Sequence, residues 1–105
     1  MENDQVYTTE EVRAQFLEEV ERIVQTWLSY KDQTKEETVH GAVFSILAAI
    51  DGSSMSLPPF ILAPLTCREN QEYAKEEGSK YYLLNNIETM YNDIGGSLHD
   101  SFGAK

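Results

Sequence analysis

The sequence predicts an α+β fold: two long antiparallel N-terminal helices packed on a small antiparallel sheet, with a short C-terminal helix. Two capping-box signatures, each followed by apolar residues at helical spacing, predict the long helices. Two short apolar segments, 59–63 and 80–84, predict the strands. From Thr38 to Thr66, Asp51 is the only charged residue, and buried apolar surface stabilises by roughly 25 cal/mol per Å². This uncharged stretch is therefore expected to supply much of the core.

The first long helix is expected to begin after Thr8. Thr8 suits the N-cap and Glu11 the third helical position, which together form a capping box. An apolar stripe at spacings of three or four follows, to about Tyr30: Val12, Phe16, Val20, Ile23 and Trp27, widened by Leu17, Val24 and Leu28. Glu18 and Arg22 are four residues apart and are expected to pair, which contributes only about 0.2 to 0.5 kcal/mol.

The second long helix is predicted over 35–51, after a turn at 31–33. Thr34 and Glu37 repeat the capping box, and Gly52 suits the left-handed conformation that often ends a helix. Gly41 lies inside this helix, where glycine costs roughly 1 kcal/mol relative to alanine. We interpret it as a point of close packing against the first helix.

The predicted strands are expected to pair with each other. Prolines 58, 59 and 64 lack the backbone donor that a sheet needs, so the segment 59–63 is expected at a sheet edge. Between the strands, 68–77 is polar and helix-forming and is ended by Gly78. Near the end of the chain, the sequence predicts a loop that passes into a short helix capped by Asp93.

The chain length of 105 residues is typical of one domain. We expect residues 1–7, which are polar, to be a disordered N-terminus and 8–105 to form a single globular domain. Cys67 is the only cysteine and is expected at a strand end, without the surroundings typical of a catalytic thiol. The N-terminal residues lack the pattern of a signal peptide, and the longest apolar run, 42–50, is about half of the ~20 residues that a membrane span needs. These features predict a cytoplasmic protein.

The net charge of −10 limits the partners that the chain can attract. A field of this sign repels nucleic-acid phosphates and anionic membrane surfaces, so neither is expected as a direct ligand. A basic protein is the favoured partner. Wide apolar helix faces in short chains are often buried by self-association, and we expect a homodimer through the first helix or through the tyrosines of the C-terminal third.

Two histidines are the candidates for metal or acid–base chemistry. His40 lies three and four residues after Glu37 and Glu36, a spacing that suits a metal site on one helix face. The alternative is a partly exposed histidine without a ligand. His99 precedes Asp100, but adjacent residues on a helix point in different directions, so that pair is not expected to act as a dyad.

A set of short motifs resembles a family of short bacterial proteins of unknown function. The motifs are Phe44-Ser-Ile-Leu47, Asp51-Gly52, Leu57-Pro-Pro-Phe60, Pro64, Asp93-Ile94 through Gly96, Leu98-His99 and Phe102. The resemblance covers roughly residues 39–102 and carries no activity or catalytic residue that could be transferred. It suggests that His99, Asp93 and Asp51 belong to one constellation.

The favoured function is a non-enzymatic protein-interaction or regulatory module, without a cofactor. The alternative is a small metal-dependent or acid–base enzyme centred on His99, with Asp51, Asp93 or Asp100 as its carboxylates. An enzyme requires His99 to converge with at least two carboxylates in a concave pocket, whereas a binding module requires only a surface.

Overall fold

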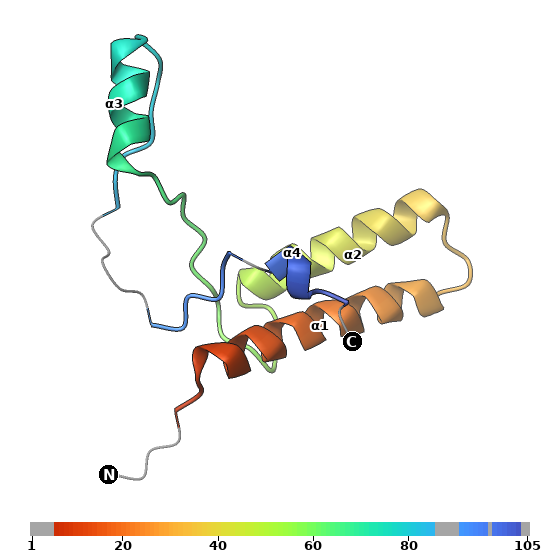
Figure 1. Ribbon diagram of the computed structural model, residues 1–105. Helices are drawn as coiled ribbons and strands as arrows, with labels where there is room; N and C mark the ends of the chain where they lie inside the picture. The colour runs from red at the N-terminus through yellow and green to blue at the C-terminus, as the bar shows by residue number, and fades with distance from the viewer. Residues whose placement is uncertain (1–5, 86–90, 97, 104–105) are drawn as a thin grey trace. The chain divides into compact units, whose positions relative to one another are not determined.

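In a computed structural model, which describes residues 6–85, 91–96 and 98–103, the chain forms four helices joined by irregular segments (Figure 1). The helices are α1 (Thr9–Ser29), α2 (Lys35–Ile50), α3 (Arg68–Glu76) and α4 (Leu98–Ser101). They fall into two compact units: unit 1 is Met1–Phe60 with Tyr91–Lys105, and unit 2 is Ile61–Met90. Each unit is described by itself. Of the expected disordered segment 1–7, residues 1–5 lie outside the described residues, and Val6 and Tyr7 have no regular structure.

Both predicted capping boxes are confirmed. Thr8 Oγ1 accepts a bond of 3.1 Å from the Glu11 backbone N–H, and the Glu11 carboxylate accepts one of 2.8 Å from the Thr8 N–H. Thr34 and Glu37 make the same two bonds at 3.0 and 2.9 Å. Since each box satisfies two backbone donors that a helix start leaves free, both long helices begin where the sequence places them.

The ends of α1 and α2 also lie close to their predicted positions. Tyr30 is the C-cap of α1, and Asp51 is the C-cap of α2. Gly52 follows with a backbone φ of +102°, a conformation that residues other than glycine rarely adopt. A Cβ on Gly52 would lie 2.7 Å from Pro59 Cγ, so the absence of a side chain also lets the segment 57–60 turn back closely.

The core of unit 1 lies between α1, α2, α4 and two loop segments. Its buried members are Phe16, Val20, Leu57 and Ile94, with Val12, Leu17, Ile46, Ile50, Phe60 and Leu98 packed around them. The rings of Phe16 and Phe60 meet edge to face, with centroids 5.2 Å apart. The expectation that 38–66 supplies much of the core is confirmed in part: Leu57 is buried in the core, and Ile46, Ile50 and Phe60 pack around it. Most of its large apolar side chains are exposed.

The predicted α+β class is wrong, because the described residues contain helices and no strand. The segment 59–63 has no regular secondary structure and does not join a ladder. Its Phe60 N–H donates to the Ile50 carbonyl at the end of α2, at 2.9 Å, and the neighbouring prolines have no N–H to donate. In unit 2 the Pro64 carbonyl accepts a bond of 2.6 Å from the Asn85 side chain instead of from a strand partner.

The two short helices differ in how well the sequence predicts them. α3 ends as expected, with Glu77 as C-cap and Gly78 at φ of +72°. Cys67 is the N-cap of α3 and not the end of a strand, and its Sγ accepts a bond of 3.4 Å from the Asn70 N–H. Asp93 does not cap α4, because its carboxylate accepts the Gly95 N–H at 3.1 Å in the preceding turn. No helix in the described ranges is long and apolar enough to cross a membrane.

Candidate functional site

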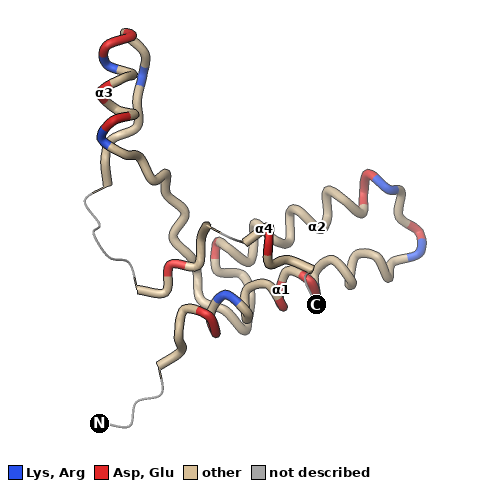
Figure 2. The backbone as a smooth tube through the Cα atoms, in the orientation of Figure 1, with Lys and Arg blue, Asp and Glu red and all other residues tan. Residues whose placement is uncertain are grey.

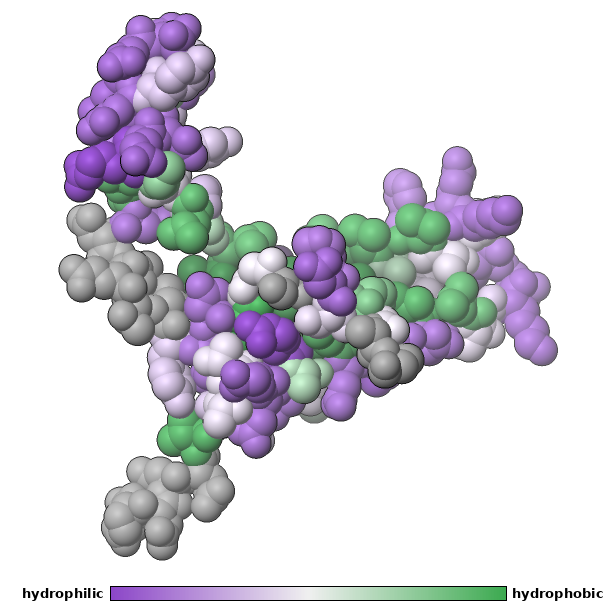
Figure 3. Space-filling model, in the orientation of Figure 1, coloured by the Kyte–Doolittle hydropathy of each residue, from purple (hydrophilic) through white to green (hydrophobic). Residues whose placement is uncertain are grey.

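One side of α2 is apolar and exposed. After the first helical turn, Figure 2 shows no charged residue along α2 until its C-terminal end. Four of its large side chains remain open to solvent: Val39 at 59%, Val43 at 50%, Phe44 at 71% and Leu47 at 52%. Figure 3 shows the hydrophobic atoms along this helix. A helix that is apolar on every side is normally buried all round, but only Ala49 of α2 is buried here.

Four residues on the exposed side follow a single line along α2, which we call the α2 seam: His40, Phe44, Leu47 and Asp51. They are separated by four, three and four residues, so they repeat on one face of the helix. All four are exposed. The seam therefore has an apolar middle and a polar residue at each end, and Val39 and Val43 flank it.

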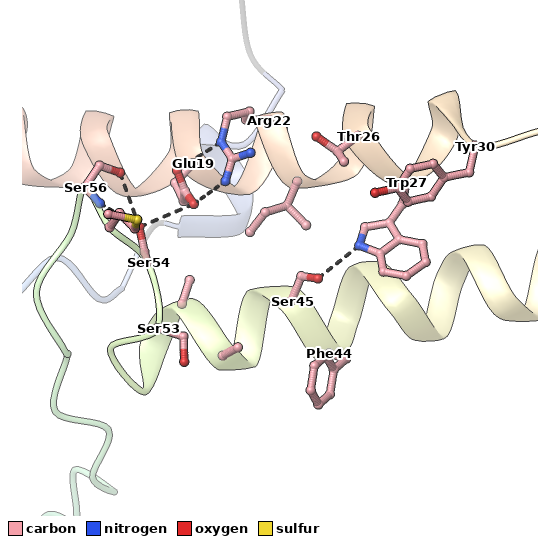
Figure 4. Close-up of a pocket in the computed structure, with 14 residues that line it drawn as sticks. Glu19, Arg22, Thr26, Trp27, Tyr30, Phe44, Ser45, Ser53, Ser54 and Ser56 are labelled. Atoms are coloured by element: carbon pink, nitrogen blue, oxygen red, sulfur yellow. Dashed lines mark hydrogen bonds and ion pairs between the residues drawn. The ribbon is translucent and has the colours of Figure 1, made fainter.

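The opposite side of α2 is fixed tightly to α1. The Trp27 indole N–H donates to Ser45 Oγ at 2.9 Å, and the Trp27 ring meets Tyr30 edge to face at 5.1 Å (Figure 4). The Trp27 ring lies over Gly41 so closely that a Cβ at position 41 would overlap it. This confirms the interpretation of Gly41 as a packing contact. The seam lies on other sides of α2, although Phe44 also lines the hollow between the two helices.

Between α1, α2 and residues 53–56 lies an open hollow of about 620 Å³ (Figure 4). At one end Arg22 pairs with Glu19 through two bonds, of 2.6 and 3.2 Å, and Ser54 donates to the same carboxylate at 3.4 Å. These hydrogen bonds lower the pKa of Glu19, and those from Arg22 have the largest effect. Burial of the carboxylate acts in the opposite direction and raises the pKa. The expected partner of Arg22 was Glu18; Glu19 takes its place because it lies on the side of α1 that faces the loop.

The Glu19 network connects the loop 53–56 to α1 and leaves no free acid or base in the hollow. Glu19 stays ionised beside Arg22, whose pKa is raised by the same contact. In the described part of the chain, no buried side-chain nitrogen or oxygen lacks a hydrogen-bond partner. Except for Glu19 and Arg22, the polar groups of this hollow are hydroxyls and the Trp27 indole, so we assign it a structural role.

The residues expected around His99 are not gathered into one pocket. His99 lies on α4 with 86% of its side chain exposed, and it does not line the hollow between α1 and α2. Its Nε2 is 3.2 Å from Asp100 Oδ1, so these neighbours do meet, contrary to the expectation that adjacent residues diverge. Asp93 is occupied by the Gly95 N–H, and Asp51 is on the α2 seam.

The proposed metal ligands on α2 are likewise separate. His40 is exposed on the seam, and Glu37 is occupied by the capping box, one residue after Glu36 in the first turn. Among the residues with described positions, no three His, Cys, Asp or Glu side chains are placed so that they could hold a metal ion. The structure thus brings together His99 with Asp100 and none of the larger predicted sets.

Unit 2 has a second, smaller hollow of about 410 Å³. It is lined by Pro64, Leu65, Thr66, Asn70, Gln71, Ala74, Lys80, Tyr81 and Tyr82. The Lys75 ammonium lies 5.2 Å from the centre of the Tyr81 ring, which holds the segment after α3 against the helix. Tyr73 and Tyr82 are exposed, so these tyrosines do not complete a core.

Comparisons with protein-family models, with curated proteins and with solved structures found no match. The resemblance to short bacterial proteins of unknown function stays a prediction. The site that the sequence reasoning missed is the α2 seam. Its signal was present: a helix without a polar face, in which the residues that do not face α1 repeat at intervals of four, three and four.

Proposed function

We propose that the chain is a cytoplasmic, non-enzymatic protein-interaction module and that the exposed face of α2 is its binding surface. The observation that carries the proposal is the exposure of Val39, Val43, Phe44 and Leu47. Complete burial of such a side chain contributes about 1.5 to 3 kcal/mol, so covering the exposed part of all four contributes roughly 5 kcal/mol before the costs of association.

Charge favours a protein over other macromolecules as the partner. Glu36 and Glu37 are exposed at the start of α2 and Asp51 at its end, in a chain of net charge −10. Nucleic acid and anionic membranes are repelled by such a field. If the partner is a different protein, its surface is expected to be apolar at the centre and basic at the rim.

The enzymatic alternative has less support in this geometry. An acid–base centre needs several groups around a substrate in a space that excludes water. Among the residues whose positions are described, His99 has one carboxylate, Asp100, within 4 Å, and both side chains are largely exposed. Such a pair is in contact with solvent on most sides.

Site-specific photo-crosslinking in the native host tests the proposal. A photoreactive phenylalanine analogue replaces Phe44, and the matched control carries it at Leu28, an apolar residue of α1 with 61% exposure. We expect a discrete protein adduct from position 44 and a much weaker one from position 28. If position 44 gives no adduct, or if both positions give the same heterogeneous mixture of adducts, the α2 face is not a binding surface.

A further inference from the structure

The α2 seam has the pattern by which one helix pairs with another. His40, Phe44, Leu47 and Asp51 alternate steps of four and three, which is two positions per seven residues, as in a coiled coil. α2 has 16 residues and is therefore about 24 Å long, enough for two full heptads. Residues at this spacing form the line along which one helix packs against another, and Val39 and Val43 lie beside it.

We propose that a second copy of this chain covers the seam, with the two α2 helices antiparallel about a two-fold axis. This inference rests on the proposed function, because it takes the α2 face as the binding surface and names its partner. It also moves the expected homodimer contact from the first helix and the C-terminal tyrosines to α2.

The polar ends of the seam determine the direction of pairing. In a parallel pair, each seam residue lies against its own copy, so Asp51 faces Asp51 and two like charges meet. In an antiparallel pair centred between Ser45 and Ile46, His40 of one copy lies opposite Asp51 of the other, and Phe44 lies opposite Leu47. The imidazole N–H then donates to a carboxylate twice in each dimer, and the apolar residues meet in the middle.

The remaining features of unit 1 make this a weak, salt-strengthened dimer. The four exposed apolar side chains of α2 make a smaller contact than the ~800 Å² per partner of a standard interface, so we expect a weak dimer. Each copy also carries a net charge of −10, and salt screens the repulsion between copies. Binding to a basic protein would respond in the opposite direction and weaken with salt.

Sedimentation equilibrium of the purified chain between about 5 and 500 µM tests the pairing, at low and at high salt. We expect the 11.9 kDa monomer to give way to a species of twice that mass, at lower concentration in the higher salt. A chain that stays helical by circular dichroism and monomeric at 500 µM in both buffers overturns the inference.

Two complementary variants test the register. His40→Asp sets two carboxylates against each other, and Asp51→Lys sets an ammonium against the histidine. Because each variant dimer loses both of its polar pairs, we expect each substitution to weaken the dimer by roughly 5- to 150-fold. In an equimolar mixture of the two variants, the carboxylate introduced at position 40 of one copy meets the ammonium introduced at position 51 of the other. We expect this mixed dimer to recover to within about threefold of the unchanged protein. A mixture no tighter than either variant alone overturns the antiparallel register.

Controls separate the pair from net charge and from folding. Gln33→Asp and Asp32→Lys make the same changes of charge in the exposed turn between α1 and α2. They are expected to change dimer affinity less than twofold, and an effect equal to that of the seam variants overturns the inference. In the crosslinking experiment, an adduct from position 44 to a different protein alone refutes self-pairing and leaves the proposed function standing, whereas no adduct refutes both.

Discussion

Replacement of Gly41 by alanine should destabilise unit 1, although alanine is the better residue for a helix. Inside a helix, alanine is favoured over glycine by about 1 kcal/mol. At position 41 the added methyl group overlaps the Trp27 ring, so that ring must move. The move breaks the bond from the indole N–H to Ser45, worth about 1 kcal/mol, and the edge-to-face contact with Tyr30, worth about 0.5 to 1.5 kcal/mol.

The two effects leave a net loss of about 1 kcal/mol in the free energy of unfolding for Gly41→Ala. Urea denaturation followed by circular dichroism at 222 nm measures it, at a few micromolar protein so that the monomer is observed. The decisive comparison uses Trp27→Ala as background. Without the ring there is no overlap, and Gly41→Ala should then stabilise by about 1 kcal/mol.

The change of sign between the two backgrounds is the test of this packing. If Gly41→Ala stabilises the unchanged protein, the Trp27 ring does not lie over Gly41. If it destabilises both backgrounds equally, the cost arises from some contact other than Trp27. Either result refutes the reasoning from the structure.

Three further changes test the core, the caps and the polar network. Phe16→Ala removes a buried ring and should cost about 3 to 5 kcal/mol. A loss below about 1 kcal/mol in urea denaturation contradicts the assigned core. Thr34→Ala removes the N-cap of α2 and should cost about 1 kcal/mol, whereas Thr34→Ser should cost much less. Glu19→Gln removes a carboxylate whose pKa is lowered by Arg22, so its stabilisation is complete above the ordinary range near 4.5 and is lost as pH falls through the lower folded value. The difference in stability between the Glu19→Gln variant and the unchanged protein should therefore be constant near pH 7 and shrink below pH 4.5; a constant difference down to pH 2 contradicts the network.

The features that depend on neighbouring residues in the sequence were predictable. Both capping boxes join residues three apart, and the glycines after α2 and α3 act on the turn next to them. The sheet was not predictable in the same way, because pairing of 59–63 with 80–84 is a contact between distant segments. The prolines were compatible with a sheet edge and so did not exclude this pairing. In the structure the Phe60 N–H donates to the Ile50 carbonyl at the end of α2 instead.

The candidate site shows the same division. Sequence identified Asp51 and His40 as the polar residues of an apolar stretch, but interpreted that stretch as core. Apolar composition indicates that a segment favours burial, but it does not show whether the segment is buried inside the same chain or by a partner. Gly41 predicts the side of α2 that packs on α1, but only the structure shows that the other side is left exposed. Likewise, the contact of His99 with Asp100 depends on side-chain rotamers in a helix of one turn, which residue spacing does not determine.

Unit 1 is built from two stretches of the chain, with the whole of unit 2 between them in sequence, and this affects how the chain folds during synthesis. In the core of unit 1, Phe16 and Leu57 pack with Ile94. The ribosome makes all of unit 2 after Leu57 and before Ile94. At about 5 to 20 residues per second, the ribosome needs roughly 2 to 7 seconds to add the intervening segment. During that time α1 and α2 are complete but lack Ile94, so the newly made hairpin exposes its inner apolar face as well as its outer one. This interval is the point at which the chain is most exposed to aggregation and to capture by chaperones.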